Sequence, residues 1–64
     1  MCLSAVYTEP KEESTVVVEE AARVTAANGR VEISTLFGET TVLEGYVVRE
    51  VDLLKNYIVL GKGS

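Results

Sequence analysis

The chain has no histidine and no tryptophan, and only one cysteine among its 64 residues. Without histidine it cannot form a Ser-His-Asp triad or a Cys-His couple, and a single cysteine excludes an internal disulfide. Basic residues are also few, because six Lys and Arg against ten Asp and Glu give a formal charge of −4. These six are scattered, whereas nucleic-acid binders usually carry a basic stripe that neutralises phosphates. The composition therefore argues against histidine-dependent enzymes and against non-specific binding of nucleic acid.

Long apolar runs are missing as well. A membrane-spanning helix needs about 20 predominantly apolar residues, and the apolar runs here extend only from Ala5 to Tyr7 or from Tyr57 to Leu60. The start of the chain also lacks the charged and apolar regions of a signal peptide. A lone free thiol is typical of a reducing compartment. We therefore expect a cytoplasmic protein that does not associate with a membrane.

The apolar content that is present, 47%, is enough for a folded domain and too high for a disordered chain. We expect residues 1–64 to form a single domain. A domain this small buries roughly 60% of the surface that its unfolded chain exposes. Disulfides, a metal or a partner subunit usually reinforce such domains. Because one cysteine leaves only the metal and the partner, we expect an oligomer.

Short segments of β-branched and aromatic residues, separated by turn residues, indicate strands throughout the chain. Asn28-Gly29 predicts a hairpin, because both central positions of a type I′ turn need positive φ. Gly38-Glu39 and Lys55-Asn56 mark further turns, and Gly45 indicates a bulge or a close backbone approach. Residues 61–64 are expected to form a flexible tail. A polar break at residues 9–14 separates the first two predicted strand segments. The segments are residues 3–8, 15–19, 23–27, 30–37, 40–43, 46–52 and 57–60.

Two of these segments are ambiguous. Residues 19–23 contain good helix formers, but one helical turn is costly to nucleate, so we predict a strand edge or a turn. In the segment 30–37, Leu36 falls on the outer face, as at a bend in a barrel or within an interface. The alternation of this segment places one set of side chains on the inner face: Val31, Ile33, Thr35 and Phe37.

The predicted fold is all-β, with about six strands. Connections this short exclude a parallel α/β sheet. We expect a small, strongly bent antiparallel sheet or barrel, comparable in size to SH3-like and Sm-like folds. Closure toward a barrel would remove the exposed strand edges that otherwise aggregate.

Carboxylates gather at Glu9, Glu12 and Glu13, between the first two predicted strands. Such a cluster can hold a hard cation, and it can equally be a solvated, charged loop. The second interpretation is the more common one for a run of charges at a polar break.

Cys2 is the remaining candidate for chemistry. As an inert residue it is a small apolar side chain at the start of a strand. If Met1 is removed, however, the α-amine and thiolate of Cys2 can close a five-membered chelate ring, and the nitrogen of Leu3 can join it. Thiolate and nitrogen ligands in a plane suit Ni(II) or Cu(II). Two chains that meet across a two-fold axis would supply two such sets, which agrees with the expected oligomer.

Three stretches of the sequence are distinctive as an ordered set: Met1-Cys2 before the first strand, residues 28–31 leading to TLFGE (35–39), and REVDLLKNYIVL (49–60). In these stretches the chain resembles the CooT family of small nickel-binding proteins, which are associated with the maturation of carbon monoxide dehydrogenase. It implies a compact β-fold and a homodimer. It also implies a Ni(II) site at the dimer interface, built on Cys2, and a nickel enzyme as client.

We therefore predict a homodimeric, non-enzymatic accessory protein that carries Ni(II) through Cys2 of both chains, for carbon monoxide dehydrogenase or another nickel enzyme. The alternative is a small β-barrel module that binds RNA or a protein strand without a metal. Leu36-Phe37, as an exposed apolar contact, is its support in the sequence.

Overall fold

The computed structural model describes residues 3–63, which fold into a single six-stranded sheet with one short 3₁₀-helix. The all-β prediction is confirmed. None of the described residues belongs to a helix that is long and apolar enough to cross a membrane. In chain order, the elements are β1 (Ser4–Thr8), η1 (Glu13–Thr15), β2 (Val16–Ala27), β3 (Arg30–Thr35), β4 (Thr40–Glu44), β5 (Tyr46–Asp52) and β6 (Tyr57–Lys62).

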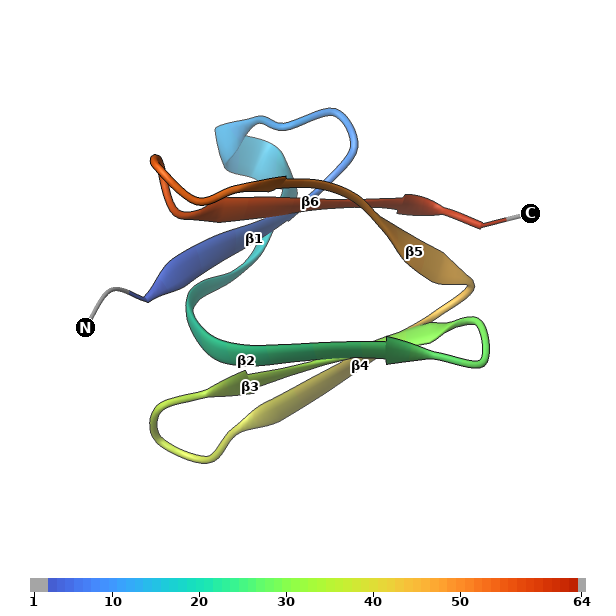
Figure 1. Cartoon of the computed structure of the whole chain (residues 1–64), viewed down its shortest axis with the longest axis horizontal. Coiled ribbons are helices and arrows are strands. Elements are labelled where there is room, and N and C mark those ends of the chain that lie inside the picture. Colours follow the sequence, from blue (N-terminus) through green and yellow to red (C-terminus); the bar gives the residue numbers. More distant parts are fainter. Residues whose placement is uncertain (1–2, 64) are drawn as a thin grey trace.

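The strand order in the sheet is β4-β3-β2-β1-β6-β5, so β1 is a central strand (Figure 1). Four neighbouring pairs, β1–β2, β2–β3, β3–β4 and β5–β6, are antiparallel. Strands β1 and β6 pair in parallel, with Ala5 opposite Tyr57 and Thr8 opposite Leu60. The prediction of a purely antiparallel sheet is therefore wrong. Its basis was the short connections between neighbouring strands, and these say nothing about two strands that meet from distant parts of the chain.

The sheet bends strongly without closing into a barrel. Its edge strands, β4 and β5, are consecutive in sequence and are joined by Gly45 alone, which has a φ of 79°. The Gly45 N–H donates to the Gly29 carbonyl at 2.7 Å, and the Gly63 N–H donates to the Gly45 carbonyl at 2.8 Å. The predicted close backbone approach at Gly45 is thus found, and it holds the two edges together at one corner.

Strand β2 continues through residues 19–23, where we predicted an interruption. Its first half pairs with β1 and its second half with β3. The register shifts between Ala21 and Arg23 against β3, and twice more against β1. Such bulges add a residue on one strand and bend it. The bend allows one continuous strand to serve both halves of the sheet, so no turn is needed.

The core consists of small and branched side chains from β1, β2, β3 and β6. The predicted inward orientation of Val31 and Ile33 is confirmed, whereas Phe37 is exposed. Strand β3 ends at Thr35, because the Thr35 Oγ1 accepts hydrogen bonds from the N–H groups of Phe37 and Glu39 and turns the chain. Phe37 therefore lies beyond the strand. The buried apolar residues are Val6, Ala21, Val31, Ile33, Val59 and Leu60.

Strand β6 is longer than predicted, since it includes Gly61 and Lys62 from the expected tail. Gly61 is buried opposite Val47 of β5. A glycine and a lysine near the end of a strand carry no β-propensity, so local sequence could not show this pairing. At the other side of the molecule, Thr15 belongs to η1 rather than to the start of a strand.

Candidate metal site at the start of β1

Cys2, the predicted metal ligand, lies outside the described residues. The structure does describe the strand that follows it. Ser4 pairs with Ala21 of β2 on one side, and Ala5 pairs with Tyr57 of β6 on the other. The Ala5 N–H also donates to the Asn56 carbonyl at 3.1 Å. The backbone that begins two residues after Cys2 is therefore held from both sides within the sheet.

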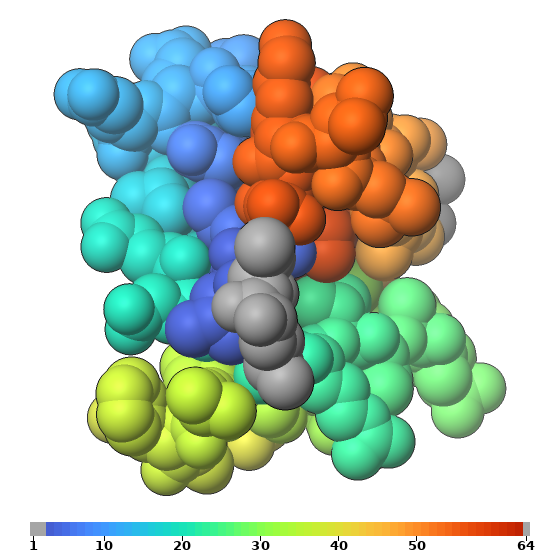
Figure 2. Space-filling model, turned by 60° about the vertical axis from the view of Figure 1, so that its left-hand side comes forward, coloured from blue at the N-terminus to red at the C-terminus, as the bar shows by residue number. Residues whose placement is uncertain are grey.

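Two exposed turns flank this start of β1. Ala21 pairs with both Ser4 and Thr35, so the β3–β4 turn (residues 36–39) begins at the same end of the sheet. The pairing of Ala5 with Tyr57 brings the β5–β6 turn (residues 53–56) to the opposite side of β1. Figure 2 shows this end, with the orange β5–β6 turn above and the yellow-green β3–β4 turn below the blue residues of β1.

These turns carry the most exposed large apolar side chains of residues 3–63. Leu36 and Phe37 in the β3–β4 turn are 60% and 77% exposed. Leu53 and Leu54 in the β5–β6 turn are 82% and 95% exposed. Apolar residues that gather on the surface often mark sites of protein contact. Leu36 lies in a turn, so the predicted bend within a strand is wrong. Its place in an interface stays a prediction.

Local hydrogen bonds fix the backbone of the β5–β6 turn. The Asp52 Oδ1 accepts hydrogen bonds from the N–H groups of Leu54, at 3.0 Å, and Lys55, at 2.8 Å. Asn56 then takes a φ of 59°, which asparagine tolerates better than most residues. The predicted Lys55-Asn56 turn is confirmed. This geometry leaves the two leucines at the tip with no place in the core.

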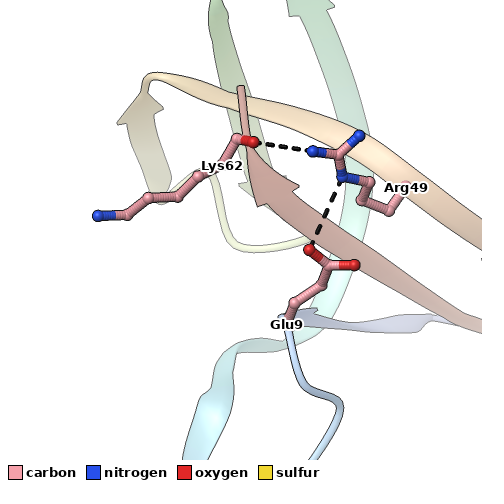
Figure 3. A network of polar contacts seen from close by, with 3 residues as sticks. All are labelled: Glu9, Arg49 and Lys62. Carbon is pink, nitrogen blue, oxygen red and sulfur yellow. Dashed lines mark hydrogen bonds and ion pairs between the residues drawn. The ribbon is translucent and has the colours of Figure 1, made fainter. Parts of the chain in front are cut away.

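The carboxylate cluster in the β1–β2 connection does not form a cation site. Glu9 Oε1 lies 3.7 Å from Arg49 Nε, and the Arg49 guanidinium also donates to the Lys62 carbonyl at 2.8 Å (Figure 3). Glu12 instead caps η1 together with Thr15. Within residues 3–63, no three Cys, Asp or Glu side chains are grouped so that they could hold a metal ion. These glutamates belong to a structural ion pair and a cap.

An aromatic cluster on β1 and β6 was not apparent from the sequence. The rings of Tyr7 and Tyr57 meet edge to face, with centroids 6.3 Å apart, and Lys11 Nζ lies 5.1 and 4.7 Å from them. The Tyr57 hydroxyl donates to Glu50 Oε2 at 3.0 Å. Four different elements contribute these residues, so no spacing in the sequence could reveal them. Lys11 covers the ring surfaces that base stacking would need.

The hydrogen bond to Glu50 raises the pKa of the Tyr57 hydroxyl above its ordinary value of 10.0, and partial desolvation and the charges of Glu50 and Asp52 act in the same direction. Because the folded-state pKa is raised, this contribution to stability is present below pH 10 and is lost as the pH rises through the folded-state value. We expect Glu50→Gln to lower the pH at which Tyr57 ionises. Ultraviolet titration of tyrosinate measures this, with Tyr57→Phe to assign the signal. An unchanged midpoint in Glu50→Gln would contradict the assignment.

Comparisons with known proteins agree with this fold. The model of the family described as CO dehydrogenase accessory protein CooT matches residues 1–61. Among solved structures, the chain is similar to a protein from Carboxydothermus hydrogenoformans assigned as CooT, with a TM-score of 0.80 and 13% identity, over 98% of this chain and 100% of that one. At this identity the structural match shows a shared fold. No curated protein matches the chain. The predicted resemblance is confirmed.

Proposed function

The chain belongs to the CooT family of CO dehydrogenase accessory proteins, and on this basis we propose that it binds Ni(II) as a homodimer through Cys2 of both chains. Carbon monoxide dehydrogenase uses nickel, so nickel is a reasonable cargo for its accessory protein. The observation that carries the proposal is the family match across Cys2, the one thiol in a chain that has no histidine.

The chemistry of Cys2 suits such a cargo. A thiolate together with a nearby backbone or terminal nitrogen gives Ni(II) a soft sulfur ligand and a nitrogen ligand. One chain supplies a single thiolate, and a two-fold axis would bring a second identical set opposite the first. The thiol must lose its proton when it binds the metal, so nickel affinity should rise with pH.

The backbone next to the proposed ligand also supports the proposal, because Ser4 and Ala5 are paired within the sheet. Strand β1 is central and is paired on both sides from its start. The strand that follows the proposed ligands is thus already ordered, and its backbone needs no rearrangement when the metal binds. The few ligands per chain leave the nickel exchangeable, as delivery requires. We propose transfer in the cytoplasm to carbon monoxide dehydrogenase or to another nickel enzyme, with no catalysis by this chain.

A titration with Ni(II) tests the proposal. We expect thiolate-to-nickel charge-transfer absorption that saturates at one metal per dimer, and its complete loss in Cys2→Ser. The matched control is Cys2→Ser with Ser4→Cys, which keeps one thiol per chain but moves it onto β1; it should not restore the signal. Intact mass spectrometry of the same samples reports the removal of Met1 and the metal stoichiometry. Equal nickel binding by Cys2→Ser would refute the proposal.

A further inference from the structure

We propose that two copies of the chain dock reciprocally, with the β5–β6 turn of each copy seated against a hollow beside Phe37 on the other. This inference rests on the proposed function in one respect, namely that the two Cys2 residues meet near the two-fold axis. It adds the surface that brings them together.

The direction of the two-fold axis determines which turns face each other. The start of β1 lies between the β3–β4 turn and the β5–β6 turn (Figure 2). We place the axis across the outside of this end of the molecule, beside the start of β1 and perpendicular to the line between the two turns. The β5–β6 turn of one copy is then placed against the β3–β4 turn of its partner, and the same contact repeats on the other side of the axis.

Each of the two turns offers exposed apolar side chains to the other. Beside Phe37 lies a hollow of about 340 Å³, whose walls include Val17 and Val18 of β2. On the other turn, Leu53 and Leu54 project into solvent. A leucine side chain seated against Phe37 and these valines would remove apolar surface from water on both copies.

The charges of the two turns are complementary as well. The hollow is rimmed by Glu19, Glu20 and Glu39, and the β5–β6 turn carries Lys55 beside its leucines. The ion pairs formed within residues 3–63 involve other side chains, Arg30 with Glu32 and Arg49 with Glu9. Asp52 precedes the turn, but its Oδ1 accepts hydrogen bonds from the backbone of Leu54 and Lys55. The Lys55 ammonium against the three carboxylates favours this reciprocal contact over one in which each turn meets the same turn of the partner.

The two turns have the composition of an interface between copies. A standard interface buries about 800 Å² on each partner. The four exposed side chains of the two turns provide the apolar centre of such an interface, with the charged groups at its rim. The contact repeats on both sides of the axis, beside the start of β1 in each copy.

Sedimentation equilibrium on metal-free Cys2→Ser protein tests the docking surface apart from nickel. Leu54→Glu places a carboxylate against the acidic hollow, so we expect at least about a tenfold weaker dimer. Leu54→Lys is the matched control, and its dimer should be weakened clearly less than that of Leu54→Glu. Phe37→Lys alone should also weaken the dimer, and Phe37→Lys combined with Leu54→Glu should restore it, since each new lysine faces a new glutamate. Circular dichroism checks that each variant is folded.

Any of three outcomes would overturn the docking surface. The losses of dimer affinity could add up in the double variant, or Leu54→Glu and Leu54→Lys could weaken the dimer equally. The Cys2→Ser protein could also stay monomeric up to about 1 mM. Nickel titration of the wild type separates this result from the proposed function. Compensation between Phe37→Lys and Leu54→Glu without nickel binding would support the surface and refute the cargo. Nickel binding by paired thiolates without compensation would refute the surface alone.

Discussion

Replacing Leu60 with alanine should lower the free energy of unfolding by about 3 kcal/mol. Leu60 is fully buried in β6, where it pairs with Thr8 of β1 on one side and Val48 of β5 on the other. Its truncation therefore leaves a cavity in a strand that forms the parallel ladder with β1 on one side and an antiparallel ladder with β5 on the other. A domain of 64 residues has a total stability of about 3 to 10 kcal/mol, so this single change removes a third of it or more.

Urea denaturation followed by circular dichroism measures the loss, at one fixed protein concentration because dimerisation contributes to stability. Val51→Ala is the control, since it also shortens an apolar side chain, but on the solvent-exposed edge strand β5. We expect its effect to stay within about 0.5 kcal/mol. A Leu60→Ala protein that unfolds at the wild-type urea concentration would show that Leu60 is not part of the core.

Replacing Gly61 with valine should lower the free energy of unfolding by about 2 kcal/mol. The side chains of Arg49 and Glu9 occupy the space that a Cβ at Gly61 would need. A side chain here must displace Arg49, and with it the ion pair to Glu9 and the hydrogen bond to the Lys62 carbonyl (Figure 3). That network connects the end of β1 with β5 and β6, so its loss weakens the contacts among three strands.

A double-mutant cycle identifies the cause. Arg49→Ala alone removes exposed polar contacts and should cost less than about 1 kcal/mol. In the Arg49→Ala background, Gly61→Val should cost at most about half of its effect in the wild type, because the main obstacle to the new side chain is gone. If the two effects simply add, the destabilisation has its origin elsewhere on β6.

Local patterns in the sequence predicted the elements that local physics determines. Asn28-Gly29 forms its hairpin with φ values of 55° and 77°, as a type I′ turn requires. Tyr46–Asp52 is a strand with the predicted bounds, and the alternation at Val31 and Ile33 correctly gave two core residues. In each case the signal lies within a few residues of the feature.

Features that depend on distant parts of the chain were missed, because local patterns carry no information about them. Nothing within β1 or β6 indicates that the two strands pair in parallel, and the bulges that keep β2 continuous arise from its two different partners. The burial of Gly61 depends on Arg49, which comes twelve residues earlier on another strand. Phe37 was misplaced because the alternation does not show that Thr35 ends the strand. For the site, Cys2 stays a prediction, while the exposed turns beside β1 became visible only in three dimensions.

The parallel pairing of β1 with β6 also has a consequence during synthesis on the ribosome. The hairpins of β2, β3 and β4 can form as soon as they emerge, but one side of β1 has no partner until Tyr57 follows, about fifty residues after Ala5, and such distant contacts form slowly. The nascent chain therefore carries an incompletely paired β1 until β6 has been made. The two turns flank a fully paired β1 only in the finished domain, so the docking surface should form late, after the last strand has joined the sheet.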